Sequence, residues 1–261
     1  MSIITTENLT IAYDDVEIVK DLNLRIPEGQ ITAIIGANGC GKSTILKTIA
    51  RVHKPKKGNI LLKGENIIEK QPKEIAKVMA FLPQSPIAPK GLSVEDLVSY
   101  GRFPYQRGFG SLSREDKDAI KWALEVVGMD KLKERPLDEL SGGQRQRVWI
   151  AMALAQQTEV LLLDEPTTYL DLSHQLEILK LLEDLNKIQG RTIVMVIHEL
   201  NNAARFADYM VGIKDGSIVC DGNPDFVMTK DNLKEIFNID AEIVKDAKYK
   251  KPVCLTYDLI Q

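Results

Sequence analysis

Residues 36–44 carry the feature that most restricts how this chain can fold. Their sequence, Gly-Ala-Asn-Gly-Cys-Gly-Lys-Ser-Thr, fits the pattern GxxxxGK[ST]. The pattern follows a continuous apolar run, residues 31–35, as expected of a strand buried on both faces, and it opens a helical stretch over residues 42–51. A glycine-rich loop between a buried strand and a helix predicts a phosphate-binding loop at the edge of an α/β sheet.

The chemistry of this loop suits a nucleotide. Glycines let the chain curl so that backbone N–H groups converge on phosphate oxygens, and the helix N-terminus adds partial positive charge. The Lys42 amine can reach the β- and γ-phosphates, and the Ser43 hydroxyl can ligate Mg²⁺. An ordinary glycine-rich turn is the alternative, but a chance match has odds of roughly 1%. The predicted nucleotide ligands are Gly36, Asn38, Gly39, Cys40, Gly41, Lys42, Ser43 and Thr44.

A pair of carboxylates follows a second buried strand. Residues 160–163 are apolar, and Asp164 and Glu165 come directly after them. Successive strand residues point to opposite sides, so the two acids cannot do the same work. We expect Asp164 to hold Mg²⁺ and Glu165 to act as general base on the water that attacks the γ-phosphate. A solvated strand end is the alternative, which the phosphate loop elsewhere in the chain disfavours.

A second candidate anion site lies at residues 140–144, Leu-Ser-Gly-Gly-Gln, immediately before a predicted helix. Ser141 is a good N-cap, and the paired glycines leave backbone N–H groups exposed. A capped helix after a glycine-containing loop is the plain alternative, but a chance match to five specified residues has odds on the order of 0.1% or less.

Alternating strands and helices predict a mostly parallel α/β sheet in a single domain, residues 1–261. Residues 84–157 interrupt the alternation and have no convincing strand, which predicts a helical insertion. Its helices are expected after Ser93, over residues 114–127, and from Ser141. Residues 226–261 form a mixed tail whose role the pattern does not indicate. The expected strands of the sheet include residues 31–35, 160–163, 193–197 and 209–213.

Charge and cysteine content narrow the class of protein. Lys and Arg number 34 against 37 Asp and Glu, a net charge of −3, which argues against nucleic acid as the main partner. Cys40, Cys220 and Cys254 are widely spaced without a CxxC pair, which fits a reducing compartment and excludes a zinc ribbon. The sequence has no apolar run of roughly 20 residues and no secretion signal, so at a membrane another chain would supply the span.

Taken together, these motifs resemble the ATP-binding cassette (ABC) ATPase family over residues 3–225. Gln84 is similar to the family's Q-loop glutamine, and Asp171 to its D-loop aspartate. His198 resembles its switch histidine, and Tyr13 the aromatic residue that stacks on adenine. One departure is Glu199, where many members carry Asp. The family's order is reproduced as Tyr13, residues 36–44, Gln84, residues 140–144, Asp164 and Glu165, Asp171, and His198.

The resemblance implies a P-loop NTPase core with an antiparallel N-terminal β subdomain and the helical insertion. It also implies a head-to-tail homodimer, in which residues 141–143 of one copy close on ATP held by the other. ATP and Mg²⁺ are the implied cofactors. The implied catalytic residues are Glu165, His198, Gln84 and Lys42; the implied metal ligands are Ser43, Gln84 and Asp164; and Tyr13, Ser141, Gly143, Gln144 and Asp171 complete the nucleotide ligands.

Two stretches resemble a narrower branch, the ATPases of bacterial ferric-siderophore, haem and cobalamin importers. They are residues 98–105, Val-Ser-Tyr-Gly-Arg-Phe-Pro-Tyr, and the D-loop region around Thr-Thr-Tyr-Leu-Asp at residues 167–171. Importers dock the coupling helices of their membrane subunits on the helical insertion. The resemblance therefore implies a polytopic permease partner, a periplasmic or lipid-anchored substrate-binding protein acting through it, and a peripheral location on the cytoplasmic face of the membrane.

Two alternatives belong to other classes. A soluble ABC ATPase of DNA repair or translation typically carries a long coiled-coil insertion, a zinc module or two cassettes, and this chain has one cassette and no zinc-ligand spacing. A small-molecule P-loop kinase would have no use for residues 140–144. We therefore predict an importer ATPase for an iron-chelate cargo, with no nucleic-acid partner; the cargo itself is selected by other chains.

Overall fold

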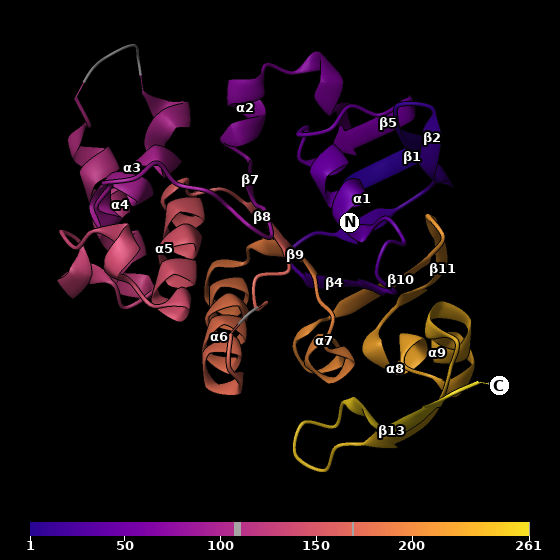
Figure 1. The fold of residues 1–261 in the computed structure, drawn as a ribbon. Helices are drawn as coiled ribbons and strands as arrows, with labels where there is room; N and C mark the ends of the chain where they lie inside the picture. Colours follow the sequence, from indigo (N-terminus) through magenta and orange to yellow (C-terminus); the bar gives the residue numbers. More distant parts are fainter. Residues whose placement is uncertain (107–110, 169, 261) are drawn as a thin grey trace.

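The computed structural model describes residues 1–106, 111–168 and 170–260. A six-stranded central sheet has the order β11-β10-β4-β9-β8-β7, and its strands from β10 to β7 are parallel. Only β11 runs antiparallel to its neighbour. The predicted mostly parallel core is therefore confirmed (Figure 1). Its strands are β4 (Ile31–Gly36), β7 (Met79–Leu82), β8 (Val160–Asp164), β9 (Thr192–Val196), β10 (Tyr209–Lys214) and β11 (Ser217–Gly222).

The N-terminal part forms a separate antiparallel sheet, as the family resemblance implied. It contains β1 (Ser2–Tyr13), β2 (Val16–Leu22), β3 (Arg25–Pro27), β5 (Lys57–Leu62) and β6 (Glu65–Asn66). Helix α1 (Lys42–Ile49) contacts strands of both sheets, and η1 (Ile67–Glu69) and α2 (Pro72–Ala76) follow β6 in the chain.

The central strands separate two hydrophobic cores. Every residue of β4, β8 and β9 is buried. Because side chains alternate along a strand, Ile34 and Leu162 join the core beneath the N-terminal sheet, whereas Ile35 and Leu163 join the core shared with the helical part. This two-sided burial explains why these strands appear in the sequence as continuous apolar runs.

The predicted helical insertion contains α3 (Val94–Ser99), η2 (Tyr100–Tyr105), α4 (Arg114–Val126), η3 (Asp130–Leu132), η4 (Leu137–Glu139) and α5 (Gly142–Ala155). Ser93, Ser113 and Ser141 each cap a helix through a capping box, so local side-chain chemistry sets where these helices begin. Between residues 84 and 157, the described residues form no strand, only an isolated bridge between Ser93 and Pro136.

The remaining helices are α6 (Leu172–Gln189), α7 (Leu200–Phe206), α8 (Pro224–Val227) and α9 (Lys230–Phe237). Helix α6 begins directly after Asp171, whose carboxylate caps it by accepting from the N–H of His174. The C-terminal segment ends in a hairpin of β12 (Ile239–Lys245) and β13 (Pro252–Leu259). The Asn201 side chain of α7 bonds both the N–H and the C=O of Cys254, at 2.8 and 3.0 Å, and so fastens this hairpin to the core.

Across the described residues, no helix combines the length and the apolar character needed to cross a bilayer.

Candidate active site

The order of the central sheet brings distant motifs to one edge. Strands β4, β9, β8 and β7 are neighbours and parallel, so their carboxyl ends meet. The phosphate loop follows β4, His198 follows β9, Glu165 follows β8, and Gln84 follows β7. Residues that lie more than 150 positions apart in the chain therefore share one site.

The phosphate loop ends at α1, and the N-terminus of this helix has the features of an anion-binding site. Gly41 precedes the helix with φ of 102°, a left-handed conformation that favours glycine, and neither a side-chain cap nor an acidic residue occupies the first turn. The helix N–H groups are thus left for a ligand. The buried Lys42 amine donates to the carbonyls of Gly36 and Ala37 at 2.8 Å each, which holds its charge inside the loop.

Ser43 and Asp164 form the candidate metal position. The Ser43 hydroxyl donates to Asp164 Oδ1 at 2.7 Å, while Asp164 Oδ2 is buried without a hydrogen-bond partner among the described residues. Burial, the largest influence, raises the pKa of the Asp164 carboxyl. An oxygen-preferring divalent cation would supply the missing partner and favour the ionised form, so these two residues fit Mg²⁺.

Glu165 lies at the centre of a polar cluster. Its Oε2 accepts from Gln84 Nε2 at 2.5 Å and from Thr168 Oγ1 at 2.9 Å, and its Oε1 lies 2.5 Å from His198 Nε2. Its backbone has φ of 52°, which is costly for a side chain of this size. The structure therefore brings Gln84, Glu165 and His198, which the family resemblance names as catalytic residues, into one cluster with both carboxylate oxygens engaged.

A cavity of about 250 Å³ opens beside these groups. Tyr13 and Ile18 line one side, and the phosphate loop, Glu165 and His198 line the rest. Tyr13 is 44% exposed, and its ring packs against His53 with centroids 4.5 Å apart. The ring is thus held in place with a face available for a base. Cys40 is absent from the lining, and its thiol is buried.

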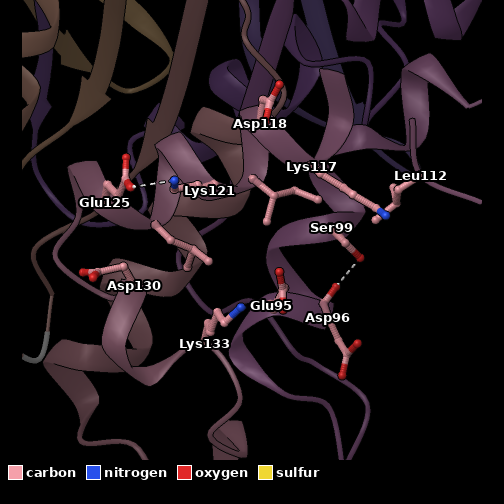
Figure 2. Close-up of a pocket in the computed structure, with 12 residues that line it drawn as sticks. Glu95, Asp96, Ser99, Leu112, Lys117, Asp118, Lys121, Glu125, Asp130 and Lys133 are labelled. Atoms are coloured by element: carbon pink, nitrogen blue, oxygen red, sulfur yellow. Dashed lines mark hydrogen bonds and ion pairs between the residues drawn. The ribbon is translucent and has the colours of Figure 1, made fainter. Parts of the chain in front are cut away.

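A larger hollow, of about 730 Å³, lies in the helical insertion (Figure 2). It shares no residue with the cavity at the sheet edge. Glu95, Asp96, Asp118, Glu125 and Asp130 line it against three lysines, so acids outnumber bases. This charge balance is poorly suited to phosphates, and size alone does not identify the nucleotide site.

The second candidate anion site lies elsewhere. Ser141 caps α5: its hydroxyl accepts from the N–H of Gln144 at 3.3 Å, and the Gln144 side chain accepts from the N–H of Ser141 at 3.1 Å. Ser141 and Gly142 are exposed, whereas Gly143 is buried. None of residues 141–144 belongs to the described lining of the phosphate cavity.

Asp171 is also outside that cavity. Its carboxylate caps α6 by accepting from the N–H of His174 and from the Ser173 hydroxyl, and it lies 2.8 Å from His174 Nδ1. These contacts, led by the backbone N–H, lower the pKa of Asp171 to about 2. One copy of the chain therefore gathers Tyr13, the phosphate loop and the Glu165 cluster, and leaves Ser141, Gly143, Gln144 and Asp171 at a separate place.

Three residues of this region were missed by the sequence analysis. Thr168 bonds Glu165 directly. The Gln146 side chain donates to the carbonyl of Pro166 at 2.9 Å, next to Glu165. The His174 ring packs so closely on Gly143 that an added Cβ would lie 3.1 Å from it. Of the three, only Thr168 lies in a stretch that resembles the importer branch, residues 167–171; Tyr169 of the same stretch lies outside the described residues.

Comparison with known proteins identifies a matching family and similar proteins. A family model described as ABC transporter matches residues 19–168. The iron(3+)-hydroxamate import ATP-binding protein FhuC of Bacillus subtilis (strain 168) is 62% identical over 261 residues, which are 100% of this chain and 97% of that protein. The ferric enterobactin transport ATP-binding protein FepC of Escherichia coli (strain K12) is 42% identical, over 92% of this chain and 89% of that protein.

Solved structures agree with the fold. A metal-chelate type ABC transporter in an inward-facing conformation aligns with a TM-score of 0.83 and 29% identity, covering 100% of this chain and 98% of that one. The dimeric cassette MJ0796, in a post-hydrolysis state bound to ADP and Pi, aligns with a TM-score of 0.75 and 30% identity, covering 84% and 98%.

Proposed function

This chain belongs to the ABC transporter family, and from that premise we propose that it is the ATP-hydrolysing subunit of an importer for ferric siderophores. The observation that carries the proposal is the separation of two anion sites in one chain. A phosphate loop with its own general base lies at the sheet edge, while the exposed N-terminus of α5 lies apart from it. The full-length similarity to a hydroxamate import ATPase supports a ferric hydroxamate as cargo.

Within one copy, the phosphate loop binds the triphosphate through backbone N–H groups and the Lys42 amine, and Tyr13 stacks on the adenine. Ser43, Asp164 and Gln84 would hold Mg²⁺, which when bound would neutralise phosphate charge. Glu165 accepts a proton from the attacking water, for which it must release part of its contact with Gln84 and His198. His198 then turns to the γ-phosphate.

The site is completed by a second copy. The cavity of about 250 Å³ is smaller than the roughly 300–1,000 Å³ of a typical ligand pocket, so one copy does not enclose a nucleotide. Ser141, Gly143 and Gln144 of the second copy cover the triphosphate, with Asp171 beside them. Hydrolysis removes the γ-phosphate that bridges the two copies, and the pair reopens; ATP acts only through its different affinity for the closed and open pairs.

A polytopic permease is the further partner. Tyr100 and Phe103 of η2 are 50% and 74% exposed, and Ile87, close behind Gln84 in the chain, is 93% exposed. Exposed apolar side chains of this kind suit contact with a coupling helix of the permease, which would hold the chain peripherally at the cytoplasmic face of the membrane. A separate substrate-binding protein delivers the chelate to the permease. No sequence or structural feature of the described residues favours the alternative role in DNA repair or translation.

The Glu165→Gln variant tests the mechanism. We expect it to bind Mg·ATP normally, to hydrolyse it about 10²–10⁴ times more slowly, and to persist as a dimer, because the base is lost while the nucleotide contacts remain. Turnover is measured by phosphate release and assembly by analytical ultracentrifugation. Lys42→Ala is the control, since it should lose nucleotide binding itself. Wild-type turnover in Glu165→Gln would refute the assignment of the base.

The cargo is tested by growth. A strain that lacks this chain should fail to grow when a ferric hydroxamate is the only iron source, and should grow normally on ferric citrate. Growth on the hydroxamate at the wild-type rate would remove the transport proposal without affecting the ATPase chemistry.

A further inference from the structure

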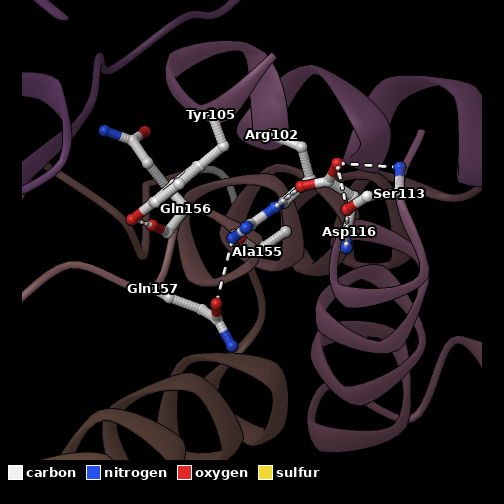
Figure 3. A network of polar contacts seen from close by, with 7 residues as sticks. All are labelled: Arg102, Tyr105, Ser113, Asp116, Ala155, Gln156 and Gln157. Atoms are coloured by element: carbon white, nitrogen blue, oxygen red, sulfur yellow. Dashed lines mark hydrogen bonds and ion pairs between the residues drawn. The ribbon is translucent and has the colours of Figure 1, made fainter. Parts of the chain in front are cut away.

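Arg102 is a buried charge far from the phosphate cavity. It lies in η2, its side chain is 4% exposed, and its guanidinium lies 3.9 Å from the centre of the Tyr105 ring. Its Nε donates to Asp116 Oδ1 at 2.8 Å (Figure 3). Its Nη1 donates to the carbonyl of Ala155 at 2.7 Å and to Gln157 Oε1 at 3.0 Å. A buried cation with this many fixed bonds holds several elements in one arrangement.

One of these elements is α5. The last turn of α5 has no basic residue of its own, and Ala155 is its final residue. Arg102 therefore serves as a C-terminal cap delivered from another element, and it places a positive charge at the negative pole of the helix. The Tyr105 hydroxyl adds a second bond, to the carbonyl of Gln156 at 2.9 Å. The backbones also touch, because a Cβ on Gly101 would lie 2.1 Å from the carbonyl oxygen of Met152.

The second element is α4. Asp116 lies in its first turn, where an anion is favoured, and its Oδ2 accepts from the Ser113 N–H and hydroxyl at 3.0 and 2.8 Å. Although burial acts to raise the pKa of Asp116, the bonds from Arg102 and Ser113 hold it below its ordinary value. The Arg102–Asp116 pair thus joins the positive pole of α4 to the negative pole of α5.

We propose that Arg102 is a positioning residue for the loop of residues 140–144: by fixing the C-terminal end of α5, it sets the orientation in which α5 presents Ser141 and Gly142 to a second copy. Gln146 holds the other half of the helix, through its bond to Pro166. Helix α5 has 14 residues, so it is about 20 Å long, and a tilt of about 5° at one end displaces the other by about 2 Å. The inference rests on the proposed pairing of two copies.

The same bonds give η2 a double role. Its exposed side chains, Tyr100 and Phe103, face a partner, while Arg102 faces inward to α5. A partner seated on η2 would therefore act on a rigid body that already includes the helix that carries residues 141–144. Burial of a charge for stability alone would not require this arrangement, because apolar residues often replace a buried ion pair without loss of stability.

The test uses the full-length Glu165→Gln protein as parent. Introducing Arg102→Met should leave the affinity of the isolated monomer for Mg·ATP within twofold, because the phosphate cavity is untouched, and should weaken ATP-dependent dimerisation about 10-fold or more. Both quantities are measured directly, by titration of the monomer at low protein concentration and by sedimentation. Arg102→Lys, which keeps the charge but loses the planar fork, should also weaken dimerisation.

Two further variants separate positioning from stability. Arg102→Met with Asp116→Leu removes both charges and should restore only part of the melting temperature that Arg102→Met loses, because no unpaired buried carboxylate remains but the Ser113–Asp116 cap of α4 is gone. It should not restore dimerisation, since Ala155 and Gln157 stay unbonded. Leu233→Ala, in α9, should lower the melting temperature and leave dimerisation unchanged. Recovery of dimerisation in the double variant, or normal dimerisation in Arg102→Met, would overturn the inference. If the Glu165→Gln parent stays monomeric with saturating Mg·ATP, the proposed pairing of two copies is refuted, and the inference about Arg102 is refuted with it.

Discussion

Cys40 occupies the middle of the phosphate loop, yet its thiol faces the protein interior. Its side chain is 6% exposed, and its Sγ lies 3.9 Å from Lys42 Nζ. Burial, the dominant influence, raises the pKa of the thiol above its ordinary 9.0, although Lys42 acts in the opposite direction. The thiol of Cys40 is thus shielded from solvent and reagents in the folded protein, although it belongs to the nucleotide-binding loop.

We expect alkylation of Cys40 by iodoacetamide to inhibit ATP hydrolysis, but slowly. Only the thiolate reacts, and a raised pKa means that little thiolate exists at pH 7–8, so the native protein should react about 10-fold or more slowly than the unfolded chain and faster as pH rises. Bound ATP should slow labelling further. Peptide mapping by mass spectrometry gives the rate at each cysteine, and Cys220, also buried but outside the loop, serves as the ATP-insensitive control. Unchanged activity after complete labelling of Cys40 would contradict the prediction.

At the level of helices and strands, two glycines of the helical insertion differ in whether the fold has room for a side chain. Gly101 lies where η2 meets α5, and no room exists for a Cβ. Gly142 opens α5, its φ is not in the left-handed region, and a Cβ added there would meet no atom within 4 Å among the described residues. The fold therefore demands the first glycine and not the second, whose open surface suits the approach of another molecule.

This contrast gives a paired prediction. Gly101→Ala should lower the free energy of unfolding by about 1–3 kcal/mol, because the methyl group overpacks against Met152. Gly142→Ala should leave it unchanged or raise it by up to about 1 kcal/mol, since Ala is the better helix former. Yet Gly142→Ala should hydrolyse ATP more slowly, because its methyl group would lie on the face that we propose meets the second copy. Urea denaturation and phosphate release measure the two effects, and full activity in Gly142→Ala would contradict this view of the loop.

For the whole molecule, the central sheet joins parts that differ in character. Its strands β4, β8 and β9 contribute alternate side chains to the core under the N-terminal sheet and to the core that the helical insertion shares with α6, α7 and α9. Because both cores are built on these strands, loss of the strands from one core would expose the apolar side chains of the other. We therefore propose that residues 1–261 form a single folding unit, with residues 84–157 and 226–261 as parts of it.

Unfolding should then be cooperative. Both tryptophans, Trp122 in α4 and Trp149 in α5, belong to the helical insertion, so their fluorescence reports on that part alone. Far-ultraviolet circular dichroism reports on the whole chain. We expect the two urea transitions to coincide, with the same midpoint and slope. A fluorescence midpoint clearly below the dichroism midpoint would show that the insertion unfolds separately.

The local chemistry of this protein follows from its amino-acid order alone. The glycine loop after a buried strand, the serine caps of three helices and the paired acids after residues 160–163 all depend on contacts within a few residues, which backbone geometry and side-chain type largely decide. The sheet class followed from the same patterns. The bond from Thr168 to Glu165 could not be foreseen in this way, because a single polar residue carries little local signal.

Which of these groups come into contact depends on how the elements pack in three dimensions. Ser43 and Asp164 are 121 residues apart, and their contact exists because β4 and β8 flank β9. The bonds of Arg102 join η2, α4 and α5, and no residue near Arg102 in the sequence indicates that it bonds the carbonyl of Ala155. Such contacts depend on how whole helices and strands pack together. This packing is driven by burial of apolar surface, which has no preferred direction, so the sequence of one segment does not show which other segment it will meet.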